Sequence, residues 1–391
     1  FLTCLHEESA VAMAHGYAKI AGKPMMALFH GTVGLQHAAM AIYNAYVDRV
    51  PVYMAAGLDY DGPVSAHNAT DLAALVRDYI KWDHQPGALS EFGRSAVRAY
   101  TLATTPPMAP VLLVLDAKLQ KGAADNPPRV PKISLPKFPS ADIESVREIA
   151  RLLLAAENPR INTGQVARTQ EGLDLLVELA ELLQVPVNGV TNRLNFPSRH
   201  PLQGTGTGTP DLILNLEPGS RVGTSPSSPR STGRPSQMPD SENLTTITIS
   251  SAEFLATSNF NVFGNGAGNA DLVIAADAQS TLPALIEEVR RLMTSDRKAF
   301  LQDRGTKIAN AHLRARRRTI TDARYGWNNS PVSLPRLAAE VWPHIKELDW
   351  SFVSPQRFLG NWPSHLWDMK KTHHFIGAHG AGGMGYGAPA A

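Results

Sequence analysis

The stretch HEESAVAMAHGYAK, residues 6–19, marks the passage from an apolar run into an amphipathic helix, and it decides the fold class. The run before it, FLTCLH at residues 1–6, predicts a β-strand. Apolar residues at helical spacing predict a helix over residues 7–21, with Gly22 as its C-cap. A strand followed directly by a helix is typical of α/β proteins. Glu7 is then expected at the carboxyl edge of a parallel sheet, where such folds build ligand sites.

The alternation of short apolar runs and amphipathic stretches continues along the chain. Further strands are expected at residues 25–30, 50–57, 110–116, 159–164, 185–190, 211–216, 245–250, 270–277, 350–354 and 373–377. Further helices are expected at residues 34–47, 68–80, 141–156, 169–183, 281–293, 298–324 and 334–345. We therefore predict an α/β protein of three consecutive domains with doubly wound parallel sheets, the first and last of them incomplete.

Changes in composition mark the domain boundaries. Proline and polar residues dominate residues 118–140, which indicates a linker. Residues 217–243 are low in complexity and poor in apolar side chains, which fits either a disordered surface insert or foreign sequence from a gene-model error. The chain divides into a first domain (1–117), a linker (118–140), a central domain (141–297), a helical connector (298–329) and the start of a third domain (330–391).

Composition and charge narrow the functional classes. With 43% hydrophobic and 18% charged residues, the 391-residue chain is that of an ordinary soluble globular protein. Its net charge of +2 gives no global field that would attract nucleic acid or a membrane surface. No apolar run reaches the roughly 20 residues that span a bilayer. The single cysteine, Cys4, is expected to be a buried structural thiol in a reducing compartment, which favours the cytoplasm and leaves an organelle open.

The chain ends with GAHGAGGMGYGAPAA, residues 377–391, where Gly380, Gly382 and Gly385 form a G-x-G-x-x-G pattern. After a strand, this pattern is typical of a dinucleotide-binding turn. Such a turn also requires a continuing βαβ unit with an acidic residue about 20 positions later. The chain ends first, so a nicotinamide dehydrogenase is the weaker interpretation, and close packing of a helix on the sheet is the alternative without a ligand.

Three segments resemble one family in the same order. The segments HEESAVAMAHGYAKIAGKP (6–24) and HGTVGLQHAAMAIYNAYVDRVPVYMAAG (30–57) resemble the pyrimidine-binding domain of thiamine-diphosphate-dependent enzymes. The superfamily is that of acetolactate synthase, pyruvate oxidase and benzoylformate decarboxylase. The segment NPRINTGQVARTQEGLDLLVELAELLQVPV (158–187) resembles its central domain, and the ending resembles the entry to its diphosphate-binding domain. The resemblance covers nearly the whole chain except residues 217–243.

The resemblance implies roles for the two ends of the chain. Glu7 matches the glutamate that hydrogen-bonds the aminopyrimidine ring nitrogen and so promotes loss of the thiazolium proton. Gly382 matches the residue whose carbonyl accepts from the pyrimidine amino group, and Met384 matches the apolar wedge between the two rings, with core filling as its alternative. The neighbouring glycines Gly380 and Gly383 are assigned to the same cofactor contact.

Two histidines are candidates for the reaction itself. His30 ends a strand where related decarboxylases carry an active-site histidine, and it either shuttles protons or makes a structural hydrogen bond. His67 falls near the place of an active-site glutamine in acetolactate synthases. His37, on the following helix, is interpreted as a helix-face residue, as are His6 and His15.

The diphosphate side is less complete. Ser354 and Gln356 are candidate diphosphate contacts, but the family's Mg²⁺ ligands are expected beyond Ala391, so no metal ligand is assigned within the chain. The resemblance leaves FAD in the central domain open, without support from the sequence. We expect a fragment truncated at both ends, which by itself binds thiamine diphosphate weakly or not at all and is inactive.

The resemblance implies a thiamine-diphosphate-dependent carboligase or decarboxylase, similar to acetolactate synthase, acting on a 2-oxo acid or related carbonyl. Its expected assembly is a homodimer or homotetramer, with the glutamate of one subunit facing the glycine-rich segment of another. The alternative is a catalytically inactive, truncated paralogue that keeps the fold and the dimer surfaces. The substrate and the acceptor are beyond this sequence.

Overall fold

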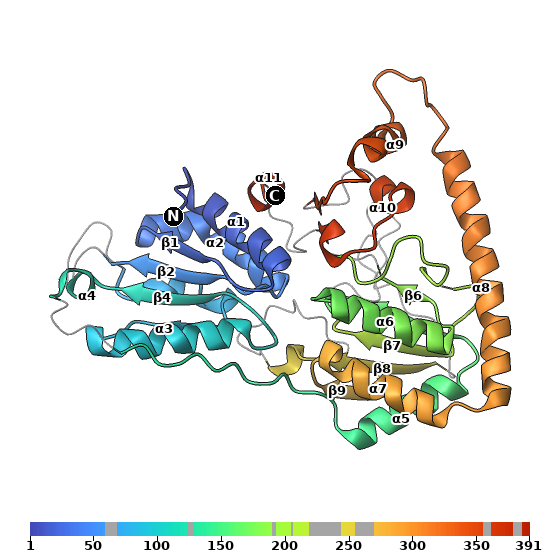
Figure 1. Cartoon of the computed structure of the whole chain (residues 1–391). Helices are drawn as coiled ribbons and strands as arrows, with labels where there is room; N and C mark the ends of the chain where they lie inside the picture. Colours follow the sequence, from blue (N-terminus) through green and yellow to red (C-terminus); the bar gives the residue numbers. More distant parts are fainter. Residues whose placement is uncertain are drawn as a thin grey trace, which may run out of the picture.

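The computed structural model describes residues 1–58, 69–123, 129–189, 193–204, 206–218, 244–254, 270–354, 361–377 and 385–391. The strands in these ranges form a four-stranded, a five-stranded and a two-stranded sheet. Every pair of neighbouring strands in them is parallel. Helices follow the strands along the sheets (Figure 1). The prediction of an α/β protein with parallel sheets is therefore confirmed, whereas the domain boundaries stay predictions.

The first sheet has the strand order β1-β2-β4-β3. Its strands are β1 (Met26–Phe29), β2 (Tyr53–Gly57), β4 (Val111–Leu115) and β3 (Trp82–His84), with helices α1 (Glu7–Ala21), α2 (Thr32–Val47) and α3 (Leu89–Thr104). Met54 and Ala56 of β2 belong to the core that includes α1 and α2, whereas Ala55 packs with Ala99 and Ala103 of α3. Since alternate strand residues point to opposite faces, both faces of this sheet are covered by helices (Figure 1).

The beginning of the chain confirms one prediction and corrects two. Helix α1 ends at Gly22, whose φ of 66° is the left-handed conformation that favours glycine, and the Gly22 N–H donates to Ala18 O at 3.0 Å. Residues 1–6, in contrast, form no strand. Leu5 is 97% exposed and Cys4 is only half-buried, because no strand or core of the described residues packs against this apolar run.

The segment between β2 and β4 differs from its prediction. The helix expected over residues 68–80 is, from residue 69 on, two short 3₁₀ turns, η1 (Leu72–Leu75) and η2 (Arg77–Tyr79). Arg77 binds both Asp71 (2.7 Å) and Asp83 (3.0 Å), and these contacts hold the turns against β3. Strand β3 and helix α3 follow, and neither is among the predicted elements.

The central sheet has the strand order β6-β5-β7-β8-β9. Its strands are β5 (Pro159–Thr163), β6 (Val187–Asn188), β7 (Leu212–Leu216), β8 (Thr245–Ser250) and β9 (Leu272–Ala275), with the turn η3 (Ala252–Phe254) and the helices α5 (Ile143–Ala155), α6 (Gln170–Leu183) and α7 (Ala278–Leu292). Side chains of Asp142, Thr169 and Asp277 cap the three helices by accepting from backbone N–H groups. These strands and helices overlap the predicted ones and enclose the largest apolar core.

The remaining elements lie around the linker and after the central sheet. They are α4 (Ala117–Lys121), α8 (Ser295–Asp322), α9 (Leu334–Ile345), β10 (Phe352–Val353), α10 (Trp362–Leu366), η5 (Thr372–His374), β11 (Phe375–Gly377) and α11 (Gly387–Ala390). The long helix α8 runs past one end of the central sheet and leads to α9 (Figure 1). Trp342, Trp350 and Trp367 pack their rings together beside the β10–β11 pair.

Glu217 corrects the boundary of the low-complexity segment. The sequence placed it at the start of an apolar-poor insert over residues 217–243, but the structure places it directly after β7 with 1% of its surface exposed. The guanidinium of Arg49, which follows α2, donates from Nη1 to Glu217 Oε2 at 2.6 Å. Residues 219–243 of the insert lie outside the described residues. A buried ion pair therefore joins the first sheet's helices to the central sheet.

Candidate functional site

Glu7 lies at the first position of α1, where the exposed backbone N–H groups of the helix favour a negative charge. His37 Nδ1 of α2 donates to Glu7 Oε2 at 2.9 Å. The Glu7 side chain is 30% exposed and the His37 side chain is 45% exposed, so the pair is partly accessible to solvent. The hydrogen bond from His37, followed by a backbone hydrogen bond, lowers the pKa of Glu7, and the carboxylate is ionised at neutral pH.

Gly34 permits this approach of α1 to α2. A Cβ atom at position 34 would lie 2.9 Å from Glu7 Oε1 and 3.1 Å from the Cβ of His30. Both residues therefore converge on the same point beside Gly34, where a side chain would displace them. His30 follows the last residue of β1, so this point lies at the carboxyl edge of the first sheet, as the sequence predicted for Glu7.

His37 is the residue of this group that the sequence analysis missed, because it was interpreted as an ordinary helix-face histidine. It follows Gly34 by three residues, which places both on the same face of α2. The spacing of a glycine and a histidine on the face toward α1 is the signal that could have identified it. The ring of His6 also meets that of His37 edge to face, at 5.0 Å between centroids.

Of the other predicted site residues, only Ser354 belongs to the described part of the chain. It follows β10 at that strand's carboxyl end and is 5% exposed. The neighbouring strand β11 ends at Gly377, where the glycine-rich segment begins, so both features lie at one edge of this pair of strands. The predicted contacts outside the described residues are His67, Gln356, Gly380, Gly382, Gly383 and Met384.

The end of the glycine-rich segment packs against α1 of the same chain. A Cβ at Gly385 would lie 4.0 Å from Glu8 Oε1, and one at Gly16 would overlap the backbone oxygen of Ala390 in α11, at 1.9 Å. Tyr386 and Ala390 form a small apolar cluster with residues of α1 and β10. Glycine at position 16 is therefore required for α11 to lie this close to α1.

A buried charge cluster supports α1 at its other end. Asp48, with none of its side chain exposed, binds Lys19 Nζ at 2.5 Å and His15 Nε2 at 2.9 Å, and Gln165 of the central domain donates to it at 3.2 Å. Burial alone would raise the pKa of Asp48, but the charge of Lys19 and the hydrogen bond from His15 lower it below its usual range. Asp48 is therefore an ionised anchor between α1 and the central domain.

Comparison with known proteins shows a similarity over the part of the chain that holds these residues. Residues 1–70, which contain Glu7, His30, Gly34 and His37, match the family described as thiamine pyrophosphate enzyme, N-terminal TPP binding domain. A benzoylformate decarboxylase from Pseudomonas aeruginosa is 27% identical over 208 residues, covering 51% of this chain and 39% of that protein. This part of the chain is therefore similar to enzymes of the thiamine-diphosphate-dependent superfamily.

Two further superfamily members match along nearly the whole chain. The mitochondrial acetolactate synthase catalytic subunit of Saccharomyces cerevisiae is 22% identical over 451 residues, covering 100% of this chain and 58% of that protein. The structure of a thiamine diphosphate-dependent 4-hydroxybenzoylformate decarboxylase from Rhodococcus jostii has the same fold, with a TM-score of 0.72 and 19% identity, covering 99% of this chain and 69% of that one. The chain spans less than two thirds of the curated relatives from Pseudomonas and Saccharomyces.

Within the described parts of the chain, every helix is too short or too polar to cross a lipid bilayer.

Proposed function

We propose that this chain is part of a thiamine-diphosphate-dependent carboligase or 2-oxo-acid decarboxylase similar to acetolactate synthase. The observation that carries the proposal is the Glu7 carboxylate, held by His37 beside Gly34 where α1 meets α2. The matched relatives are named as a benzoylformate decarboxylase and an acetolactate synthase, which supports a 2-oxo acid as the substrate class.

The residues at this edge fit a cofactor with a basic ring nitrogen. The ionised Glu7 carboxylate, of which one oxygen is bound by His37, is suited to accept a hydrogen bond from a protonated ring nitrogen. The missing Cβ of Gly34 leaves room for the Glu7 carboxylate and His30 to meet at this point. Thiamine diphosphate would supply a nucleophilic thiazolium carbon. Glu7 would bind the proton on the ring nitrogen of its pyrimidine, and this hydrogen bond would promote loss of the thiazolium proton.

His30 has a separate place in this proposal. Its side chain is exposed at the end of β1, close to the same point beside Gly34 as Glu7. An imidazole there would exchange a proton with a substrate carboxylate or hydroxyl. We also propose an active-site role for His67, as the sequence analysis predicts.

The remaining contacts complete the proposal. Ser354 and Gln356 would bind the diphosphate, and the glycine-rich segment would contact the pyrimidine through Gly382 and its neighbours Gly380, Gly383 and Met384. Mg²⁺ would accompany the diphosphate, since this ion binds phosphates together with oxygen ligands. A homodimer or homotetramer is the proposed assembly, and the cytoplasm is the proposed compartment.

The test is deuterium exchange at the thiazolium carbon of bound thiamine diphosphate, followed by proton NMR, in the complete protein that contains this chain. Glu7→Gln removes the negative charge and keeps the size of the side chain, so the exchange rate should fall by about 10²–10⁴. Glu8→Gln, one residue further along α1, is the matched control and should leave the rate within about twofold, since no charge is removed from the pair with His37. An unchanged rate in Glu7→Gln would refute the role of Glu7.

A further inference from the structure

A second group of chemically competent side chains lies at the other edge of the β10–β11 pair. Asp349 precedes β10 by three residues, and His373 and His374 form the end of η5 directly before β11. The two strands are parallel, with Phe352 opposite Phe375. Their amino ends therefore meet, and this brings the three side chains together at the edge opposite Ser354.

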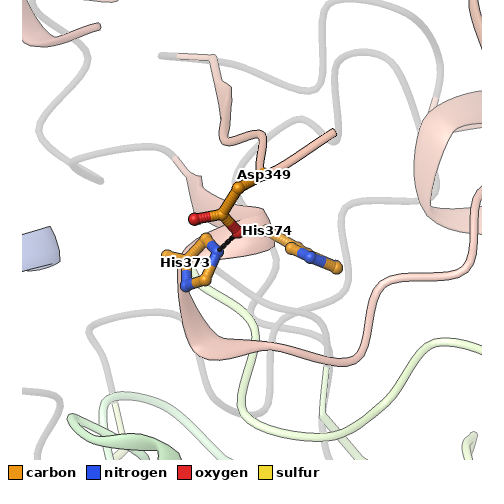
Figure 2. A group of neighbouring side chains, drawn as sticks. All are labelled: Asp349, His373 and His374. Atoms are coloured by element: carbon orange, nitrogen blue, oxygen red, sulfur yellow. Dashed lines mark hydrogen bonds and ion pairs between the residues drawn. The ribbon is translucent and has the colours of Figure 1, made fainter. Parts of the chain in front are cut away.

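The three side chains are close enough to share one ion (Figure 2). His373 Nε2 lies 2.8 Å from Asp349 Oδ1, and one ligand atom from each residue lies within 4.8 Å of the others. Ligands around a tetrahedral Zn²⁺ at about 2.0–2.1 Å are roughly 3.3 Å apart. Small side-chain rotations would therefore close the group around a metal ion.

His374 is held in place by its surroundings. Its ring stacks on Trp350 at 4.2 Å between centroids and an interplanar angle of 20°, and only 5% of the residue is exposed. The backbone N–H of Lys370 donates a long hydrogen bond to His374 Nδ1, at 3.3 Å. A neutral imidazole has one acceptor nitrogen, so metal binding would replace this bond while the stacking keeps the ring oriented.

Asp349 is satisfied in the absence of a metal by a nearby cation. Lys371 Nζ lies 3.0 Å from the same Oδ1 atom that binds His373. The ammonium group and a metal ion would compete for this carboxylate, because both need its negative charge at the same place. The lysine is half-exposed and unbranched, so it can turn into solvent when an ion binds.

We propose that Asp349, His373 and His374 form a binding site for one divalent transition metal ion such as Zn²⁺, with water completing its coordination. Two imidazoles and one carboxylate suit zinc better than magnesium, which prefers an all-oxygen shell. Asp349 is 73% exposed, which leaves room for the water ligand. The ion would join the amino ends of β10 and β11 and is separate from the proposed cofactor site.

The test is isothermal titration calorimetry of the tag-free 391-residue chain with ZnCl₂. We expect binding of one ion per chain with a dissociation constant in the micromolar range or below. His373→Ala and Asp349→Asn change exposed or half-exposed side chains, and each should weaken binding at least about tenfold. His344→Ala, an exposed histidine of α9 outside the group, is the matched control and should bind as the unmodified chain does.

Lys371→Ala provides a test that a chance cluster of surface histidines would not pass. Removing the competing ammonium group should tighten Zn²⁺ binding severalfold, whereas a site that does not use Asp349 would be unaffected. Far-UV circular dichroism of each variant should match the unmodified chain. Absence of micromolar binding, binding unchanged in both ligand variants, or unchanged binding in Lys371→Ala would each overturn the proposal.

Discussion

The buried ion pair between Arg49 and Glu217 allows a stability prediction with a stated magnitude. Glu217 is 1% exposed and accepts hydrogen bonds from Arg49 Nη1 at 2.6 Å, from the backbone N–H of Ser251 at 3.0 Å and from that of Ala278 at 3.2 Å. Replacing it with glutamine would leave the guanidinium, of which 6% of the side chain is exposed, without a compensating charge. Breaking one side of such a buried pair destabilises a protein by about 3–5 kcal/mol.

Urea unfolding followed by far-UV circular dichroism measures this effect. In Glu217→Gln the transition that unfolds the central sheet should occur at a lower urea concentration. The free energy of unfolding should fall by about 3–5 kcal/mol. Glu178→Gln, which breaks the exposed ion pair with Arg290, is the matched control and should lose less than about 1 kcal/mol. A loss in Glu217→Gln no larger than in this control would refute the reasoning.

A double variant separates the lost pair from an unspecific packing defect. Arg49→Met removes the guanidinium charge while keeping an unbranched side chain. Combined with Glu217→Gln, it leaves neither charge buried alone, so the double variant should be more stable than the sum of the two single effects predicts. For residues in direct contact the interaction energy is expected at about 0.5–3 kcal/mol. Strict additivity would show that the two side chains do not act as a pair.

Three further outcomes test the surroundings of Glu7. His37→Ala should raise the pKa of Glu7 toward its ordinary value, because the substitution removes the hydrogen bond that lowers this pKa. Carbon-13 NMR titration of the Glu7 carboxyl measures the change, and an unchanged pKa would contradict the contact with His37. Gly34→Ala should separate Glu7 from His37, since the new Cβ would lie 2.9 Å from Glu7 Oε1, and a crystal structure that keeps the 2.9 Å contact with His37 would disprove this. Asp48 has a lowered pKa when folded, so it stabilises the protein above the unfolded carboxyl's pKa of about 3.9, and this contribution is lost as the pH falls toward the folded pKa. Urea titrations at about pH 5 and pH 3 measure how much unfolding free energy is lost on acidification. Asp48→Asn should lose less of it than the unmodified protein, and equal losses in the two proteins would contradict this role of Asp48.

The elements that the sequence predicted well are those whose burial is uniform. The central strands β2 and β4 of the first sheet are continuous apolar runs because helices cover both of their faces, and in the central sheet all five residues of β7 are likewise buried. Helix α1 was predicted to within its observed bounds because Gly22 terminates it. Residues 1–6 have the same apolar character, but a strand also needs a neighbour, and this requirement is not visible in the run itself.

Other features depend on contacts between distant segments. Strand β3 is three residues long and contains Asp83 and His84, so its sequence carries little of the apolar alternation by which strands are recognised. The residues that follow Glu217 in the chain are polar and simple in composition, so its burial could not be recognised from the sequence. Its partners Arg49 and Ser251 come from other parts of the chain, and a local sequence pattern cannot predict contacts between residues so far apart.

The turn after α2 shows how these distant contacts bear on the candidate site. Arg49 has a φ of 52°, a left-handed conformation that costs a non-glycine residue about 1–2 kcal/mol. Glycine would relieve this strain but would leave Glu217 buried without its partner, at about 3–5 kcal/mol, so arginine is the more stable choice. Asp48, the residue before it, binds Lys19 near the end of α1. Helix α1 therefore carries Glu7 at one end and is tied at the other to a turn bound to the central sheet, so the position of Glu7 depends on the packing of the central domain.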